Sequence, residues 1–371
     1  MTIHPLRAAS AALRTTTALR TKTTLRAKPV LSLSAVALAA SLALTGCVAG
    51  EGSAADSGSG TTGDAEGWSD DSLSIDFATY NPLSLIIKDQ GWLESTLGDD
   101  VEVTWVQSAG SNKANEALRA GVVDVGSTAG SAALLARSNG SPISSVYVYS
   151  QPEWSAIVVP ADSSITSVAD LEGASVAATK GTDPYFFLLQ ALDEAGLSVD
   201  DVEVQNLQHA DGKAALESGA VDGWAGLDPL MATSEIEAGS KLIYRNVDFN
   251  TYGLLNATDE FLTENPDLAQ VVVDAYEKAR LWVEENPDEA VQILADAAGI
   301  DPAIAEKVLT ERTSFDIDPV PGDAQRAVLE VVGPYFVEAG DVDDQSQIDT
   351  ALDELLDPSY ATAADPSTIA D

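Results

Sequence analysis

One short pattern occurs twice in the chain, about a hundred residues apart, and it constrains the fold more than any other feature. Residues 117–124 read ALRAGVVD, and residues 215–222 read ALESGAVD. In both copies a helical stretch reaches a glycine, and an apolar run follows it. Strand and helix patterns of matching order flank both copies. The sequence therefore predicts two similar α/β lobes whose strands run largely parallel.

The individual elements follow from hydrophobic periodicity and from helix start and stop signals. Asn81 and Pro82 are typical of an N-cap and a first helical position, and Asp183-Pro184 repeats that start in the second unit. We expect strands over 73–78, 101–106, 122–125, 174–178 and 202–207, with helices over 82–91, 115–120 and 183–196.

Two apolar segments, 155–160 and 252–256, lie where the two units would join, and they predict a two-segment hinge. The expected lobe 1 is discontinuous and comprises 72–157 and 252–371, while lobe 2 comprises 158–251. Long helices should begin at Asn265-Pro266 and Asn286-Pro287, with each asparagine as the N-cap. We expect a last helix over 346–356 and a loosely held tail from residue 357.

The first residues have the pattern of an export signal. Basic side chains precede an apolar run over 30–44, which ends in Leu44-Thr-Gly-Cys47. We interpret 1–46 as a lipoprotein signal peptide, Cys47 as the lipidated first residue, and 47–71 as a flexible tether. This places the protein on the outer face of the cytoplasmic membrane, which it contacts through the lipid. The alternative is an ordinary signal peptide in which the cysteine stands by chance.

Composition excludes several classes of function. The chain has 59 acidic and 19 basic residues, a net charge of −40 that repels nucleic acid and anionic lipid headgroups. Its single cysteine leaves no thiol for a disulfide, and His209 has no partner at metal-ligand spacing. Because no nucleophile elbow, phosphate loop or dinucleotide motif occurs, we predict no cofactor, no metal and no enzymatic activity. Paired carboxylates leave an enzyme on the same fold as a distant alternative.

The predicted binding site lies where ligands bind in open α/β sheets, beyond the carboxyl ends of the strands. The loops at those ends are small, polar and rich in hydroxyl groups, and they cover 79–81, 108–112, 126–130, 150–152, 180–183 and 224–228. Hydroxyl groups and free N–H groups at helix starts can bind an anion without much positive charge. Lys113 and Lys180 are the cations nearest to these loops in the sequence.

Several motifs in these loops resemble one family. The motifs are 108–111 (SAGS), 126–130 (GSTAG), 167–173 (SVADLEG), 180–182 (KGT), 217–224 (ESGAVDGW) and Asp228-Pro229. Over roughly residues 72–358 the chain resembles the aliphatic-sulfonate-binding family of ABC transporter substrate-binding proteins. The resemblance implies a type II periplasmic-binding-protein-like fold with mixed sheets flanked by helices. It also implies a monomer that closes over a small organosulfonate-like anion and delivers it to an ABC permease. Taurine, nitrate or another small metabolite are the alternative ligands.

The resemblance also implies roles for particular residues. Those that would donate hydrogen bonds to the ligand are Ser108, Ser111, Ser127, Thr128 and Thr182, and those lining its apolar part are Tyr80 and Trp224. The predicted ligand-binding set is completed by Asn81, Gln151, Asp183, Asp228 and Tyr252. The family pattern is not followed at 110–112 and 129–130, which indicates a different head group or tail.

For some of these residues a purely structural role is the alternative to ligand binding. Trp224 could pack in the core, and Asn81, Asp183 and Asp228 could be helix caps. An Asp228 that faced the cleft would favour a ligand with an amine.

Overall fold

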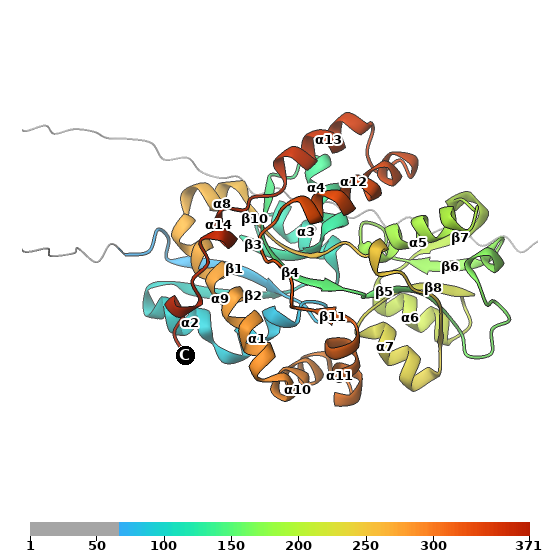
Figure 1. Ribbon diagram of the computed structural model, residues 1–371, viewed down its shortest axis with the longest axis horizontal. Helices are drawn as coiled ribbons and strands as arrows, with labels where there is room; N and C mark the ends of the chain where they lie inside the picture. The colour runs from blue at the N-terminus through green and yellow to red at the C-terminus, as the bar shows by residue number, and fades with distance from the viewer. Residues whose placement is uncertain (1–66) are drawn as a thin grey trace, which may run out of the picture. The chain divides into compact units, whose positions relative to one another are not determined.

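The computed structural model describes residues 67–371, in which two sheets are flanked by helices. The predicted signal peptide, the lipidation of Cys47 and most of the predicted tether lie outside the described residues. The first sheet has the order β11-β4-β10-β3-β1-β2 and the second β7-β6-β8-β5-β9 (Figure 1). The predicted mixed α/β fold class is confirmed.

The first sheet and its helices, called here the first half, come from both ends of the described chain. Its strands are β1 Ser72–Phe77, β2 Glu102–Gln107, β3 Val125–Ala129, β4 Ile143–Pro152, β10 Gly253–Thr258 and β11 Thr313–Ser314. Its earlier helices are α1 Pro82–Gln90, α2 Trp92–Leu97, α3 Ser111–Arg119 and α4 Gly130–Ser138. Its later helices are α8 Asp259–Glu264, α9 Pro266–Glu285, α10 Pro287–Ala298, α11 Pro302–Glu311, α12 Asp323–Glu338, α13 Gln345–Glu354 and α14 Ser359–Thr362.

The second half is built from the intervening chain. Its strands are β5 Ser155–Val159, β6 Ser175–Ala178, β7 Glu203–Asn206, β8 Gly223–Leu227 and β9 Lys241–Tyr244. Helix α5 Asp183–Glu194 covers one face of the sheet, and α6 His209–Glu217 and α7 Leu230–Thr233 cover the other (Figure 1). The chain enters this half from β4 through Glu153 and Trp154, and it returns to the first sheet between β9 and β10.

The repeated sequence pattern has a direct structural explanation. Asp124, its last residue in the first copy, accepts a hydrogen bond from the Ser74 N–H of β1 at 2.8 Å. Asp222, the matching residue, accepts one from the Ser175 N–H of β6 at 2.9 Å. In both units the aspartate N–H also donates to the carbonyl of the same serine, at 2.8 Å. In each unit the aspartate therefore holds the chain beside the neighbouring strand: Asp124, which precedes β3, is held beside β1, and Asp222, which precedes β8, is held beside β6.

Some local predictions are wrong for physical reasons. The predicted strand at 122–125 starts only at Val125, because the chain still turns after α3 and leaves Val122 52% exposed. Asn265 and Asn286 stand at the N-cap positions, but neither side chain makes a cap hydrogen bond. Asn286 Nδ2 instead donates to the Trp282 carbonyl of the preceding helix, at 3.0 Å.

The tail after residue 357, predicted to be loosely held, packs against α9. Asp274 on α9 accepts hydrogen bonds from the Asp365 N–H at 2.9 Å and from Thr368 Oγ1 at 2.8 Å. Ile369 is buried, and Lys278 donates to its carbonyl oxygen at 3.1 Å. These contacts anchor the tail to the first half of the molecule.

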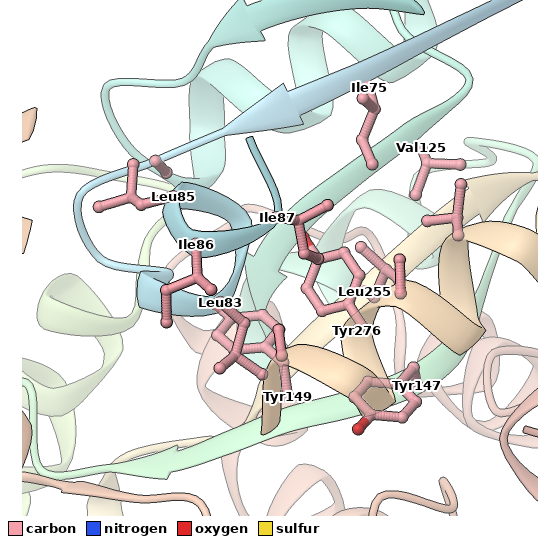
Figure 2. Close-up of a cluster of buried hydrophobic side chains, with 14 of the residues drawn as sticks. Ile75, Leu83, Leu85, Ile86, Ile87, Val125, Tyr147, Tyr149, Leu255 and Tyr276 are labelled. Carbon is pink, nitrogen blue, oxygen red and sulfur yellow. The ribbon is translucent and has the colours of Figure 1, made fainter. Parts of the chain in front are cut away.

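The core lies in several clusters of buried side chains. Figure 2 shows one of them, where apolar side chains of α1 meet Tyr276 of α9 and residues of the first sheet. A second cluster joins the two halves, because α12 packs on both α4 and α5. Within it, the rings of Phe186 and Phe336 lie 4.5 Å apart. Among the described helices, none is long and apolar enough to cross a membrane.

Candidate functional site

A buried carboxylate lies at the centre of the loops that follow β1, β2 and β3. Asp76 of β1 is fully buried and accepts hydrogen bonds from the Ser127 N–H at 2.8 Å and from Ser127 Oγ at 3.0 Å. The Ser108 side chain bonds to the same carboxylate. Burial raises the pKa of Asp76 to about 7, and these hydrogen bonds oppose the rise. Two of the three predicted serine donors, Ser108 and Ser127, therefore already bond to a carboxylate of the protein.

Three tyrosines surround Asp76. Tyr80 donates its hydroxyl hydrogen to the Ser127 carbonyl at 2.9 Å, and Tyr276 accepts a hydrogen bond from Asn81 Nδ2 at 2.9 Å. Tyr149 is fully buried, and its hydroxyl has no hydrogen-bond partner among residues 67–371. Burial raises the pKa of Tyr149 well above its usual value, and the nearby Tyr80, Tyr276, Asp76 and Asp183 raise it further. The phenol group of Tyr149 thus lies among the polar groups of the site.

A second buried carboxylate joins the two halves at the start of α5. Asp183 accepts hydrogen bonds from Ser131 Oγ of α4 at 2.7 Å and from Trp154 Nε1 at 2.8 Å. Thr251 donates to the same carboxylate through its N–H at 2.9 Å and through its Oγ1 at 2.6 Å. Burial raises the pKa of Asp183, while these four donors lower it. Trp154 and Thr251 both belong to the crossing segments, so Asp183 lies next to them.

A third buried carboxylate is the only one of the three that pairs with a cation. Asp228, which follows β8, lies 3.0 and 3.1 Å from Nη1 of Arg312 in the first half. Arg312 Nη2 contacts Glu235, which follows α7. Burial raises the pKa of Asp228 to about 6 although Arg312 lowers it, so the carboxylate is ionised at neutral pH. This ion pair bridges the two halves.

The halves also meet where α3 and α6 begin. A Cβ at Gly110 would lie 3.0 Å from His209 Nε2 and 3.0 Å from Asn112 Oδ1, which places these groups side by side. Burial lowers the pKa of His209 to about 4, so the ring is neutral. Asn112 Oδ1, Gln208 Oε1 and His209 Nε2 have no hydrogen-bond partner within the described part of the chain. Neither helix has a side-chain cap at its N-terminus.

The space between the halves is almost closed in this structure. A cavity of about 10 Å³ remains between Tyr80, Trp154, Asp228 and Arg312, which is close to the smallest volume that holds one water molecule. Larger hollows of about 400 and 490 Å³ lie elsewhere, beside α13 and near residues 118–124. None of the predicted binding loops lines them. A guest would therefore need the halves to separate before it could enter.

The structure gathers only part of the predicted site. The residues that take part in the buried contacts around the cleft are Tyr80, Ser108, Ser127, Asp183 and Asp228. Asn81 caps α1 and accepts from the Ser84 N–H, as its structural alternative predicted. Trp224 is fully buried in a cluster beneath α6, so it packs in the core. Of the remaining members, Gln151 pairs with Ser314 of β11, and the Tyr252 carbonyl accepts from the Gly130 N–H at 2.9 Å.

The predicted hydroxyl donors are mostly engaged within the protein. Thr128 Oγ1 donates to the Ala129 carbonyl at 2.9 Å, and Thr182 Oγ1 donates to the Thr179 carbonyl at 2.6 Å. Ser111 Oγ accepts from the Ala129 N–H at 3.0 Å, which leaves its own hydrogen available. Lys180 lies over the ring of Tyr185, 5.2 Å from its centroid, and Lys113 pairs with Glu116 on the same helix.

Sequence reasoning missed several residues of the site, among them Asp76, Tyr149, Trp154 and Arg312. An acid inside the apolar strand 73–78 was the one available signal for Asp76. Arg312 lies between two predicted elements, and nothing local indicates a partner so far away in the sequence. Within residues 67–371 no group of three or more histidine, cysteine, aspartate or glutamate side chains is placed to hold a metal ion.

Two relatives of this chain carry the same description. A putative aliphatic sulfonates-binding protein of Escherichia coli (strain K12) is 30% identical over 233 residues, which cover 62% of this chain and 72% of the relative. A protein of the same description from Bacillus subtilis (strain 168) is 27% identical over 289 residues, 74% of this chain and 86% of the relative.

Among solved structures, the alkanesulfonate-binding protein SsuA from Xanthomonas axonopodis pv. citri, bound to MOPS, has a TM-score of 0.69. It is 24% identical and covers 76% of this chain and 98% of its own, so the likeness establishes the fold. The family profile described as NMT1/THI5 like matches residues 85–290, more than half of the chain. Taken with the two-sheet fold, this match means that the chain belongs to the NMT1/THI5-like family.

Proposed function

We propose that the protein is the extracytoplasmic solute-binding component of an ABC importer and that it captures a small organosulfonate-like ligand by closing its two halves. Two relatives described as putative aliphatic sulfonates-binding proteins support the ligand class. The fold shared with a sulfonate-binding protein that holds MOPS supports the mode of binding.

The observation that carries the proposal is the bridging ion pair between Arg312 and Asp228. Arg312 belongs to the first half and Asp228 to the second, and both side chains are almost fully buried. Such a pair is desolvated only when the halves are together, because separation would return both charges to water. The structure therefore corresponds to the closed member of a pair of states, and a bound guest would favour that state further.

Helix starts around the cleft supply the donors that a sulfonate needs. Helices α3 and α6 begin without a hydrogen bond from a capping side chain. Their first N–H groups and the positive ends of their dipoles attract the oxygens of an anion. Such donors act at short range, so they can hold a sulfonate although the protein as a whole is strongly acidic.

We infer that Cys47 carries the lipid anchor, that 47–71 tether the protein to the outer face of the cytoplasmic membrane, and that an ABC permease receives the ligand. The protein acts as a monomer and does not convert its ligand chemically. Mass spectrometry of the membrane-bound protein tests the anchor, since Cys47→Ser should remove both the lipid mass and the membrane association.

Calorimetric and thermal-shift titrations test the binding function. The probes are MOPS, propane-1-sulfonate, 2-aminoethanesulfonate, nitrate and sulfate, and product analysis after each titration tests for turnover. We expect at least one sulfonate to bind with a micromolar dissociation constant, about −8 kcal/mol, and to raise the melting temperature. Binding of nitrate alone would contradict the sulfonate assignment, and turnover of any probe would contradict the assignment as a binding protein.

A further inference from the structure

The small cavity between the two halves has one cationic side chain in its wall. Its lining comes from both halves, and Arg312 is the only lysine or arginine among the described residues that form it. Tyr80, Trp154 and Val308 add aromatic and apolar surface, with the rings of Tyr80 and Trp154 6.1 Å apart. A site of this composition suits a small guest that carries an acid group on an apolar body.

The guanidinium of Arg312 has a donor that the protein does not use. The side chain is only 1% exposed, and its Nε has no hydrogen-bond partner among residues 67–371. By contrast, the Nε atoms of Arg245, Arg280 and Arg326 each donate to a glutamate, at 3.0, 2.9 and 2.9 Å. A buried charged donor without an acceptor is costly, so the exception at Arg312 points to an acceptor that the protein itself does not supply.

The acceptors that Arg312 does have both belong to the second half. Its Nη1 bonds to Asp228, and its Nη2 bonds to Glu235. Glu235 has a second cation nearby, because Lys307 Nζ lies 3.7 Å from its carboxylate. Asp228 forms no other ion pair within the described part of the chain. Glu235 can therefore keep a cation when the guanidinium is engaged elsewhere, whereas Asp228 shares its one cation with any anion that enters.

Arg312 and Asp228 flank the segment that crosses from the first half to the second. The Arg312 carbonyl accepts from the Glu153 N–H at 2.7 Å, and the Asp228 N–H donates to the Trp154 carbonyl at 3.0 Å. An acid group bound to Arg312 would therefore lie at the junction of the halves. There it can hold them together in the way that Asp228 does in this structure.

Building on the proposed function, we propose that Arg312 binds the acid group of the ligand and that Asp228 occupies the same guanidinium when the protein is free. Asp228 is thus an internal competitor, which the guest must displace before the halves can close around it. Nε supplies one charged donor, and the Nη1 group that Asp228 vacates supplies another. Arg312 then selects for an anion, and Asp228 lowers the affinity while it keeps the free protein closed.

The competition predicts an effect with a distinctive sign. Asp228→Asn removes the competing charge, yet its Oδ1 can still accept from the Ala232 N–H, as Asp228 does at 2.9 Å. Arg312 still pairs with Glu235. In calorimetry at pH 7.5 we expect Asp228→Asn to bind propane-1-sulfonate at least tenfold more tightly than the unaltered protein does. A pair that served only to hold the halves together would make the variant bind equally or more weakly, and either result would overturn the proposal.

A double variant assigns the effect to Arg312. Arg312→Met combined with Asp228→Asn removes both charges of the pair, and circular dichroism checks that the protein is folded. It should bind propane-1-sulfonate at least a hundredfold more weakly than Asp228→Asn alone. Equal affinities of these two variants would mean that Arg312 does not contact the ligand.

Asp274→Asn is the matched control for Asp228→Asn. The Asp274 carboxylate is also buried, but it lies on α9 and binds the Asp365 N–H of the tail. Both substitutions remove one buried negative charge. Asp274→Asn should change the affinity for propane-1-sulfonate less than threefold, and an equal gain in both variants would show a general charge effect rather than competition for Arg312.

Arginine side-chain NMR spectra test the contact in the unaltered protein. The Nε–H signal of Arg312 is assigned by its loss in Arg312→Lys. Saturation with propane-1-sulfonate should shift this signal, while the Nε–H signals of Arg245, Arg280 and Arg326, which already bond to glutamates, stay in place. An Arg312 signal that does not move at saturation would contradict the proposal.

A second anion separates this inference from the proposed function. Butanoate has the chain of propane-1-sulfonate with a carboxylate in place of the sulfonate. If butanoate alone binds, and binds more tightly to Asp228→Asn, the sulfonate function fails and the role of Arg312 stands. If propane-1-sulfonate binds equally to every variant, the function stands and the role of Arg312 fails. If neither anion binds to the unaltered protein or to Asp228→Asn, both are wrong.

Discussion

Arg312 and Asp228 form a buried ion pair across the two halves, with Nη1 of the arginine 3.0 and 3.1 Å from the two carboxylate oxygens. Replacing Arg312 by methionine leaves Asp228 as an uncompensated charge in the interior. We expect Arg312→Met to lower the free energy of unfolding by about 3–5 kcal/mol. Urea denaturation measures this loss. The double variant with Asp228→Asn should recover a large part of it, because both charges are then absent.

Arg326 provides the matched control, since it pairs with Asp353 and Glu330 on the surface. Arg326→Met should change stability by less than about 1 kcal/mol, as is usual for exposed ion pairs. Similar losses in Arg312→Met and Arg326→Met would show that the bridging pair is not formed in solution.

Asp76 should make stability fall as the solution becomes less acidic. Burial raises its pKa in the folded protein from 3.8 to about 7, so folding takes up a proton between these values. Stability from this group is therefore unaffected below about pH 4, decreases between pH 4 and 7, and is constant above. A shift of about three pKa units corresponds to roughly 4 kcal/mol. Asp76→Asn should thus gain stability relative to the unaltered protein as pH rises from 4 to 7.

Paired chemical denaturation series at several pH values measure that difference. Asp183 and Asp228 also have raised pKa values, but they are present in both proteins and cancel in the comparison. A stability difference that stays constant from pH 4 to pH 8 would rule out the titration of Asp76 in this range.

The repeated aspartates should contribute independently. Asp124→Ala removes a hydrogen bond to the Ser74 N–H from a half-buried carboxylate, and a loss of about 1–2 kcal/mol is expected. Asp222→Ala removes the matching bond at an exposed position, with a loss of about 0.5–1 kcal/mol. Because the two sites belong to different sheets, the double variant should equal the sum within about 0.5 kcal/mol. Equilibrium unfolding of the three variants tests this, and strong coupling between the sites would refute it.

Gly212 allows α6 to approach β8 closely. A Cβ at this position would lie 2.8 Å from Trp224 Nε1, a distance that requires the side chain or the helix to move. Gly212→Ala should therefore destabilise the protein by about 1–3 kcal/mol, although alanine normally favours a helix. Trp224→Phe introduces a smaller ring, so it should restore part of the stability lost in Gly212→Ala. Thermal unfolding of both single variants and the double variant measures the rescue, and no rescue would mean that the contact with Trp224 is not the cause.

Much of the fold was predictable because local signals and tertiary packing agree. Asn81 and Pro82 stand at the N-cap and first position of α1, as that dipeptide predicts. Helix α5 starts one residue earlier than the matching dipeptide predicts, with Thr182 at the N-cap position and Asp183 as its first residue. At Val122 the sequence pattern is ambiguous, because an apolar residue after a helix-ending glycine is consistent with either a strand or an exposed turn. At Asn286 the side chain had a competing acceptor on the preceding helix, which sequence alone does not indicate.

The site was less predictable because its groups come together from distant parts of the chain. Asp76 has hydrogen-bond partners only because Ser127 of β3 and Ser108, which follows β2, approach it in the fold. Arg312 meets Asp228 across 84 sequence positions. Hydroxyl groups could be assigned to loops from the sequence, but whether a hydroxyl still has a hydrogen to donate depends on the acceptor that folding places beside it. Thr128 and Thr182 are the clearest examples.

The second half begins and ends on neighbouring strands, since Ile157 of β5 pairs with Tyr244 of β9. Its entry and exit points therefore lie together, and the chain before and after it builds the first half. The segment from β5 to β9 is therefore a continuous insertion whose two ends lie on neighbouring strands. A segment exchanged between β4 and β10 would have to keep the contacts of Asp183 and Asp228 with the first half, while the tail that packs on α9 would stay unchanged.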